Sequence, residues 1–445
     1  MSPVLFVSFP KPKLAFFNHS TFALCRSPGA PRSSARTTPS WDLPFILVAE
    51  RLTLGNTREL LLSVAEEVFG EHGFHRSSVS SICRRAGVAR ATFYQYFADK
   101  EALYSALVEQ LQDELLGHLA QVFSASLDPK VKITHGLGHH LQFIRLRRQA
   151  YRVFREGEFI LPEVSRRFYR ALIAQWAKPL EEGVREGVFR PDLDVEICAL
   201  AILGMVEFLA MRYLIWEAEG LPEGALAKME EFLLYGMDSG APRPPAPQGL
   251  PAEWGEERVP ETSRESLLRA AEILFGTQGY YATQVVNITQ AAGLGAGTFY
   301  LYFPTKEAAF VELVRTINQK LRQHIRQAIQ GVADRRWIEE LGFRAFFSFI
   351  TRHPHAYRIV REAEFVVPEV GQEYYRRFAS GYMRGLEEGM RRGEIRELPP
   401  EPLAYSLMGM GHALGLKWVL WEGRRDPPEE GLQALFSLIF RGLLR

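Results

Sequence analysis

Apolar side chains recur every three or four residues along most of this chain, which is the spacing of one face of an α-helix. The pattern is long and continuous over six segments of the first half, and the second half repeats it. No segment alternates apolar and polar residues as a half-buried strand does. We therefore expect an all-α protein. The long segments of the first half cover residues 99–126, 131–148, 149–160, 162–187, 195–218 and 223–237.

Three shorter helical stretches precede each set of long segments. Asn56 is a good N-cap for the first of them and has Glu59 three residues later, and Thr262 and Glu265 repeat this spacing. The second and third stretches are separated by a tight turn that contains glycine. Helix, short glycine turn and helix is the helix-turn-helix pattern. These second and third stretches cover residues 78–85 and 89–97, and then 284–291 and 295–303.

The second half of the chain repeats the first at an offset of 206 residues. RATFYQYFADKE (90–101) falls on AGTFYLYFPTKE (296–307), and YRVFREGEFILPEV (151–164) falls on YRIVREAEFVVPEV (357–370). The offset becomes 205 by Trp216 and Trp421. A near-gapless match of this length is a duplicated domain pair and not a short solenoid repeat. We therefore expect two tandem units, each with a helix-turn-helix head and a helical body.

The expected organisation has six parts. A proline-rich linker separates the two units, and its six prolines make it extended and semi-rigid. The acid-poor N-terminus has no amphipathic period, so a disordered extension is favoured over a transit peptide. The parts are the extension (1–52), the first head (53–98) and body (99–238), the linker (239–261), and the second head (262–304) and body (305–445).

Composition adds few constraints. The formal net charge of +1 neither favours nor excludes nucleic acid as a partner, so any basic surface must be local. Three cysteines without a C-x-x-C pattern indicate a reducing compartment, and we expect a cytoplasmic protein. The longest apolar run, 197–216, is broken by Glu207 and Arg212, and we expect no membrane span.

The third helix of the first head has two distinct faces. Phe93 and Phe97 lie four residues apart and should enter the core together. Ala91 and Gln95 then point away from the core, with Thr92 and Tyr94 on either side of them. Such a face can enter the major groove of DNA. Lys100 and Lys306 begin the following helices, where an exposed ammonium and free backbone N–H groups can hold a phosphate.

The twice-occurring pattern A-G-V/L-x-x-x-T-F-Y-x-Y-F-x-x-K-E resembles the signature of the TetR/AcrR family of bacterial transcriptional regulators. The resemblance covers both repeats and implies DNA-binding heads on effector-binding, dimerising bodies. The dimer partner of each repeat would be the other repeat, which makes an intrachain pseudo-dimer. The DNA-contacting positions would be Ser78, Arg84, Arg90, Ala91, Thr92, Tyr94, Gln95, Tyr96 and Lys100, and Gln284, Gly297, Thr298, Tyr300, Leu301, Tyr302 and Lys306.

The two heads differ in charge. The first carries Arg84, Arg85 and Arg90, where the second has the uncharged Gln290, Ala291 and Ala296. Because phosphate neutralisation dominates affinity, we expect the first head to bind DNA more strongly. Gln95 can pair with adenine, whereas the matching Leu301 can only pack on a thymine methyl group. These differences predict an asymmetric operator.

Two alternatives stay open. In one, the second head is structural, and two chains form a homodimer that supplies two strong heads. In the other, the chain is a helical enzyme or metal-binding protein. His135 and His139 share a helix face, but no HExxH pattern accompanies them, and no catalytic motif occurs. We therefore expect no enzyme, no metal and no cofactor, and name double-stranded DNA and an unidentified small-molecule effector as partners.

The bodies offer weak candidates for the effector site. Arg152 and Glu156 lie four residues apart, as do Arg358 and Glu362, so each pair can form along a solvated helix face. Apolar and acidic residues nearby could instead line a cavity, although aromatic residues at helical spacing are more often core. The candidate lining residues are Phe143, Phe154, Glu158, Trp176, Phe346, Phe347 and Glu364.

Overall fold

The computed structural model of the protein describes residues 57–247 and 262–445, and every regular element in these two ranges is a helix. In the first repeat the elements are α1 (Thr57–His72), α2 (Val79–Ala86), α3 (Arg90–Tyr96), α4 (Lys100–Ser124), α5 (Pro129–Leu146), α6 (Arg148–Ile160), α7 (Pro162–Arg185), α8 (Val195–Ala210), a π-helical turn η2 (Met211–Trp216) and α9 (Ala225–Tyr235). In the second repeat they are α10 (Ser263–Gln278), α11 (Val285–Ala291), α12 (Thr298–Tyr302), α13 (Lys306–Ala328), α14 (Arg335–Arg352), α15 (Pro354–Val366), α16 (Pro368–Arg391), α17 (Pro400–Gly415), η3 (Leu416–Trp421) and α18 (Glu429–Arg441).

The all-α prediction is confirmed, and local sequence explains where several helices begin. Thr262 and Glu265 form the predicted capping box at the start of α10, with the Thr262 side chain accepting from the Glu265 N–H. Asp99 and Thr305 cap α4 and α13 in the same way. Asn56, the extension (1–52) and part of the linker (248–261) lie outside the described residues.

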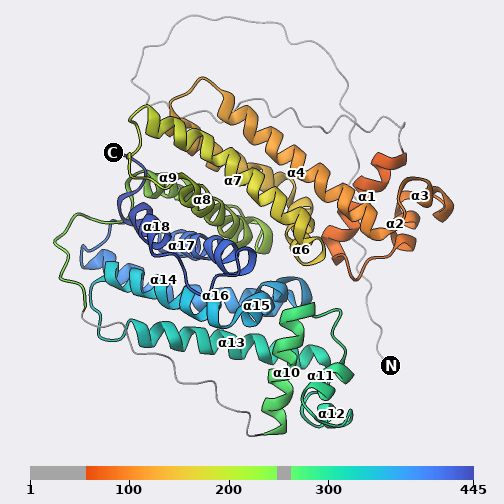
Figure 1. Cartoon of the computed structure of the whole chain (residues 1–445). Coiled ribbons are helices and arrows are strands. Elements are labelled where there is room, and N and C mark those ends of the chain that lie inside the picture. Colours follow the sequence, from red (N-terminus) through yellow and green to blue (C-terminus); the bar gives the residue numbers. More distant parts are fainter. Residues whose placement is uncertain (1–56, 248–261) are drawn as a thin grey trace, which may run out of the picture. The chain divides into compact units, whose positions relative to one another are not determined.

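The two repeats meet along α8 and α17, which cross in the middle of the molecule (Figure 1). At the crossing, a Cβ added to Gly204 would overlap with the carbonyl oxygen of Gly409, and one added to Gly409 would overlap with that of Gly204. The helices therefore approach as closely as their backbones allow. Helices α9 and α18 pack beside this pair and complete a four-helix interface.

Short backbone pairings after α9 and α18 repeat across an approximate twofold axis. The Met237 N–H donates to the Ile439 carbonyl at 2.8 Å, and the Leu443 N–H donates to the Leu233 carbonyl at 2.9 Å. The two bonds are equivalent in the duplication. Met237 corresponds to Leu443, and Leu233 corresponds to Ile439, each 206 residues later. The interface is therefore isologous, as in a twofold homodimer, but it is formed within one chain.

Helix α8 with its π-helical extension, Val195–Trp216, is long and apolar enough to cross a membrane, but 94% of its most apolar window is buried inside the protein. Its apolar surface packs against α7, α17 and α18. Burial of this kind is that of the central helix of a bundle. The apolar run is thus explained by the interface between the repeats.

The described part of the linker is attached to the second body. The Arg336 guanidinium, which is 1% exposed, donates to the carbonyl oxygens of Ala241 at 2.6 Å and Pro242 at 3.0 Å. The Trp337 indole donates to the Pro244 carbonyl at 2.9 Å. These bonds satisfy a buried charge and hold the first part of the linker against the start of α14.

Candidate functional site

In the first head, α3 presents the face that its sequence predicts. Phe93 and Phe97 are buried, at 0% and 5% exposure, while Ala91 and Gln95 are exposed. Tyr94 and Tyr96 are also exposed, and Thr92 is half-buried. The helix has no side-chain cap at Ala89, as its sequence indicates. The exposed side of α3 therefore combines hydroxyl and amide groups, which can bind phosphates or base edges.

Two arginines extend this surface. Arg84, in the last turn of α2, and Arg90, in the first turn of α3, are exposed. Arg85 is different, because its guanidinium donates to both carboxylate oxygens of Glu71 at 2.6 and 2.9 Å. Ser78 is exposed and caps α2 by accepting from the Ser81 N–H. Arg84 and Arg90 thus add two exposed cations next to the exposed face of α3.

Lys100 and Lys306 do not have the exposed ammonium that we expected. The Lys100 ammonium donates to the carbonyl oxygens of Phe74 at 2.8 Å and Ser77 at 3.1 Å. The Lys306 ammonium donates to those of Tyr280 and Thr283, both at 2.8 Å. Each lysine thus turns inward and holds the loop that precedes the second helix of its head. The backbone N–H groups at the starts of α4 and α13 remain candidates for phosphate contacts.

The second head presents a more apolar surface. Its third helix, α12, begins at Thr298 and not at 295 as predicted, because the flexible Gly295 and Gly297 leave the first turn without a cap. Leu301 is 80% exposed and Tyr300 is 60% exposed. Tyr302 and Gln284 are also exposed, and Thr298 is half-buried.

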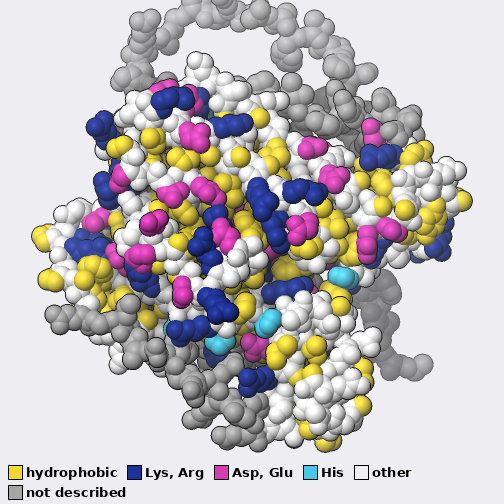
Figure 2. All heavy atoms as spheres, viewed as in Figure 1, with side chains coloured by type: hydrophobic (Ala, Val, Ile, Leu, Met, Phe, Trp, Pro, Cys, Tyr) yellow, Lys and Arg dark blue, Asp and Glu magenta, His cyan; other side chains and the backbone are white. Residues whose placement is uncertain are grey.

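No residue from 280 to 305 carries a charge. In Figure 2 the second head, at lower right, is mostly white and yellow, whereas Lys, Arg, Asp and Glu side chains are visible on the first head. The helix-turn-helix part of the second head therefore presents only backbone, hydroxyl, amide and apolar groups, and the nearest cations before it, Arg264 and Arg269, lie on α10.

Two glutamates hold the heads on the bodies, one from α6 and one from α15. Both carboxylate oxygens of Glu156 lie within hydrogen-bonding distance of the Phe74 N–H, at 3.0 and 2.9 Å. Glu362 accepts in the same way from the Tyr280 N–H at 3.0 Å. The predicted pairing of Arg152 with Glu156 and of Arg358 with Glu362 on a solvated face is therefore wrong, because both carboxylates are buried against the heads.

The two heads also contact each other. The His75 imidazole of the first head stacks on the Tyr281 ring of the second, with the ring centroids 4.0 Å apart. These residues occupy the same position in the two repeats. Arg76, next to His75, donates to the carbonyl oxygen of Val366 at the end of α15, at 3.0 Å. The spacing of the heads is thus set by direct contacts as well as by the bodies.

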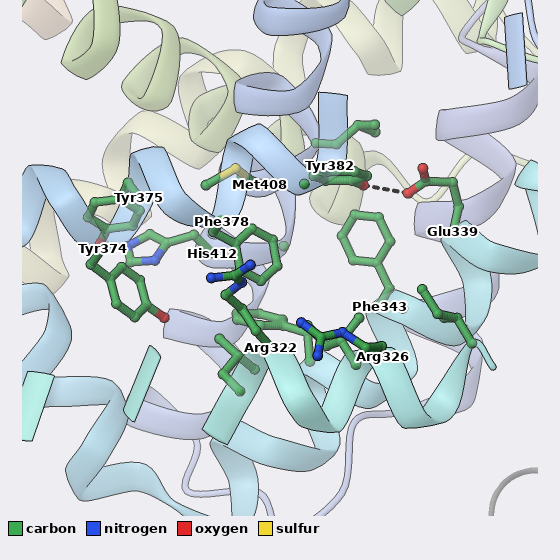
Figure 3. Close-up of a pocket in the computed structure, with 18 of the residues that line it drawn as sticks. Arg322, Arg326, Glu339, Phe343, Tyr374, Tyr375, Phe378, Tyr382, Met408 and His412 are labelled. Atoms are coloured by element: carbon green, nitrogen blue, oxygen red, sulfur yellow. Dashed lines mark hydrogen bonds between the residues drawn. The ribbon is translucent and has the colours of Figure 1, made fainter. Parts of the chain in front are cut away.

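The second body contains a cavity of about 340 Å³ between α13, α14, α16 and α17 (Figure 3). Its walls are mainly apolar and aromatic, and Phe208 from α8 of the first repeat completes them. Concave, mostly apolar cavities with a few polar groups are the usual form of small-molecule sites. The lining includes Phe208, Ile325, Ile329, Phe343, Phe346, Tyr357, Val360, Phe378, Leu407 and Met408.

Polar side chains lie at separate places in this wall. Arg322 and Arg326 come from successive turns of α13, and Figure 3 shows them next to each other. Arg315, earlier on the same helix, pairs with Glu373 at 2.9 Å, whereas Arg322 and Arg326 have no acidic partner within the described part of the chain. These two cations are available to an anion.

A second polar group consists of Arg335, Glu339 and Tyr382. The Arg335 Nε donates to a Glu339 carboxylate oxygen at 2.7 Å, and the Tyr382 hydroxyl donates to the other oxygen. Burial raises the pKa of Tyr382 far above its ordinary value, so the hydroxyl keeps its proton. Because these charges satisfy one another, this part of the wall is closer to neutral than the Arg322–Arg326 part.

Of the seven lining residues that the sequence suggested, only Phe346 lines this cavity. The prediction was wrong for Glu158 and Glu364, because each carboxylate forms an ion pair with an arginine of the other repeat. Phe347 was wrong because it is fully buried and packs on Trp418. Phe143, Phe154 and Trp176 were wrong because they pack within the first body, against His118, Phe168 and Phe123.

Sequence reasoning missed Arg322 and Arg326. One signal was available, since the matching positions in the first repeat are Leu116 and Ala120. Two cations that replace uncharged residues on one helix face set the second body apart from the first.

We expect the pH dependence of stability to report the docking of the first head. Burial raises the pKa of Glu156 from 4.5 to about 7, against the opposing effect of the Phe74 N–H. A carboxyl whose pKa is raised in the folded state stabilises the fold fully below pH 4.5 and loses that contribution as the pH rises through 7. The glutamine variant E156Q should lack this component in thermal melts between pH 5 and pH 8. Parallel pH profiles for the two proteins would contradict the assignment.

A matched glycine in each repeat should respond oppositely to alanine. A Cβ on Gly136 would lie 2.5 Å from the Phe123 ring, whereas one on Gly342 would meet only the Ile325 side chain at 4.0 Å. We expect Gly342→Ala to stabilise the protein by up to about 1 kcal/mol through helix propensity. Gly136→Ala should destabilise it by roughly 1–3 kcal/mol through overpacking. Urea denaturation of both variants checks the prediction, and equal effects would contradict it.

Comparison with known proteins identifies the heads. The family model described as "Bacterial regulatory proteins, tetR family" matches residues 61–107 and again 267–313. The uncharacterised HTH-type transcriptional regulator YdgC of Bacillus subtilis is 29% identical over 188 residues, which is 41% of this chain and 92% of YdgC. The HTH-type transcriptional repressor KstR2 of Mycolicibacterium smegmatis is 28% identical over 32% of this chain and 71% of its own length.

A solved structure of the fatty acid degradation regulator FadR from Bacillus halodurans matches with a TM-score of 0.39 and 21% identity, covering 41% of this chain and 96% of that chain. The matches to YdgC and KstR2 each span less than half of this chain but most of the relative. A chain that contains two family units is expected to match a single-unit relative in this way, over less than half of its own length and most of the relative's.

Proposed function

We propose that this chain, which belongs to the TetR family of bacterial regulatory proteins and carries two family units in tandem, is a cytoplasmic, ligand-responsive repressor that binds an asymmetric operator. The observation that carries the proposal is the arrangement of α15. Within eight residues this helix supplies Tyr357 and Val360 to the cavity wall, Arg361 and Glu364 to ion pairs with the first repeat, and Glu362 to the second head. A ligand that displaces α15 therefore acts on both heads.

The ion pairs between α6 and α15 are reciprocal. Arg155 donates to Glu364 at 2.8 Å, and Arg361 pairs with Glu158. Arg361 and Glu364 are the counterparts of Arg155 and Glu158 at the 206-residue offset. Helix α6 in turn holds the first head through Glu156. The two helices that anchor the heads are thus fixed to each other, which supports a concerted change in head spacing.

Head spacing is a natural point of control for binding to DNA. Two recognition helices must be about 34–36 Å apart to enter successive major grooves. A ligand lowers operator affinity only if it binds better to a state with the wrong spacing. In the proposed mechanism the ligand fills the cavity, α15 shifts, and the heads leave the spacing that the operator requires.

The chemistry of the cavity supports an amphipathic anion as the effector. The apolar and aromatic walls would hold a hydrocarbon or ring system, and its volume lies at the lower end of the roughly 300–1,000 Å³ of small-molecule sites. Arg322 and Arg326 would bind a carboxylate or phosphate. Fatty acids and their thioesters with a phosphorylated carrier have this combination of an apolar chain and an anionic group.

Unequal heads support an asymmetric operator. The first head would bind its half-site more tightly through Arg84 and Arg90, and Gln95 would read a base there. The second head would use Leu301 and Tyr300 against apolar base edges such as thymine methyl groups. The two half-sites would then differ in sequence.

Exchanging a charge between the heads tests this asymmetry. We expect Arg90→Ala to weaken operator binding and to lower the slope of log affinity against log salt by about one, because one phosphate contact is lost. Ala296→Arg at the matching position should raise affinity and the slope. Fluorescence anisotropy at several salt concentrations measures both. Unchanged salt slopes in both variants would place these positions away from the phosphates.

One observation favours the alternative in which the second head is structural, namely the absence of charged residues from 280 to 305. Native mass spectrometry of the protein with its operator separates the two. One chain per duplex supports the fused pseudo-dimer, and two chains per duplex support the alternative. A gel-shift titration with dodecanoate and dodecanoyl-CoA then tests the response to effector. Operator that stays bound at saturating probe would contradict an anionic amphipathic effector.

A further inference from the structure

We infer that the chain binds one effector molecule, in its second body, because the first body fills the corresponding space with its own side chains. This inference rests on the proposed function and concerns the regulation of the same site. In a symmetric homodimer each body would be equivalent, so two effector sites would be expected. Here the two bodies differ at the positions that decide whether a cavity exists.

The matched glycines Gly136 and Gly342 report the space available at one position in the two repeats. In the first body, an added Cβ at Gly136 would lie 2.5 Å from the Phe123 ring and 3.0 Å from the Trp176 ring. In the second body, the nearest atom to a Cβ on Gly342 is 4.0 Å away. The same helix position therefore faces packed aromatic rings in one repeat and open volume in the other.

The residues that fill the first body are large. Trp176 is 0% exposed and meets the Phe123 ring edge-on, with the ring centroids 5.1 Å apart. Their counterparts in the second body are Tyr382 and Ile329, which both line the cavity. Replacing tryptophan by tyrosine and phenylalanine by isoleucine removes volume from the core, and the space that is not refilled remains as a void.

Two further exchanges remove side chains completely. Gln175 in the first body corresponds to Gly381, and Val206 corresponds to Gly411, and both of these glycines line the cavity. Gln175 is buried, at 9% exposure, and Val206 is buried at 0%. The first body thus has four side chains where the second has smaller ones or none, and of the two glycine positions only Gly411 is partly refilled, by the Phe343 ring 2.9 Å from an added Cβ.

A single site has a measurable consequence for regulation. Binding to one site per chain follows a simple hyperbola and is not cooperative within the chain. The effect would reach the first head through the ion pairs of α6 with α15, the contact of Arg76 with Val366 and the stacking of His75 on Tyr281. Phe208, the cavity residue that the first repeat contributes, places the ligand directly against the interface between the repeats.

Isothermal titration calorimetry of the full chain with dodecanoate and with dodecanoyl-CoA tests the inference. We expect one binding site per chain for whichever probe binds, the free acid or the thioester. The variant Gly381→Gln copies the first body, and a Cβ there meets only the end of the Arg384 side chain at 4.0 Å, so the variant should fold. Its affinity for the probe should fall by roughly tenfold or more.

A matched control is Gly117→Gln, because Gly117 lies on an exposed face of α4 with no atom within 4 Å of an added Cβ. This variant should bind the probe like the unmodified protein. Two sites per chain, or unchanged affinity in Gly381→Gln, would overturn the inference while leaving the proposed repressor function in place. If neither probe binds a chain that still binds its operator, both the inference and the effector class in the proposed function fail.

Discussion

Replacing Gly204 with leucine is expected to destabilise the protein by about 3 kcal/mol or more and to abolish operator binding. The physical reason is the contact between backbones at the crossing of α8 and α17, where even a Cβ would overlap with the carbonyl oxygen of Gly409. A leucine must push the helices apart along their whole interface. Because the position of each head depends on its body, the loss of this packing also changes the head spacing.

Urea denaturation and fluorescence anisotropy with operator DNA measure the two effects of Gly204→Leu. Gly117→Leu is the matched control, since it places the same side chain on an exposed helix face with open space. It should change stability by no more than about 1 kcal/mol. A Gly204→Leu variant as stable as this control would mean that the two repeats do not pack as described.

Glu364→Ala should cost about 3–5 kcal/mol of unfolding free energy, because it leaves the buried Arg155 guanidinium without its carboxylate. Both side chains are largely buried, with 12% and 9% exposure, and the Trp216 indole also donates to Glu364 at 3.3 Å. Removing one partner of a buried pair is more damaging than removing both. The double variant Arg155→Met with Glu364→Leu should therefore recover most of the lost stability.

The double variant also separates stability from control of the heads. If the reciprocal pairs fix α6 to α15 in one register, the apolar replacement should restore folding but weaken the effect of the ligand on operator affinity. Thermal melts and gel shifts with and without dodecanoyl-CoA provide the two readouts. Unchanged ligand response in a stable double variant would remove the ion pairs from the proposed coupling.

The heads could be predicted closely from the sequence because their signals are local. Phe93 and Phe97 are set four residues apart by helix geometry, and the glycine turn before α3 needs only its own residues. The duplication added a second, independent copy of each signal. The shortening of α12 was not predicted, since the effect of Gly295 and Gly297 depends on the balance between weak helix propensity and packing in this head.

The cavity and the couplings could not be predicted in the same way. Glu158 and Glu364 lie among apolar residues on their helices, a pattern that fits a cavity wall as well as an ion pair. Only the packing of α6 against α15 shows that they meet arginines of the other repeat. Lys100 turns inward to the carbonyl oxygens of Phe74 and Ser77, which come within its reach only when the loop between α1 and α2 is folded. The periodicity of the sequence predicts neither these ion pairs between the repeats nor the direction of the Lys100 side chain.

In-vitro selection from a random pool of duplexes tests whether one chain reads DNA with two unequal heads. We expect two half-sites that lie about one helical turn apart, or a multiple of it, and differ in sequence, with stronger selection at the half-site of the first head. A perfect palindrome, in which both half-sites are selected equally, would contradict this expectation.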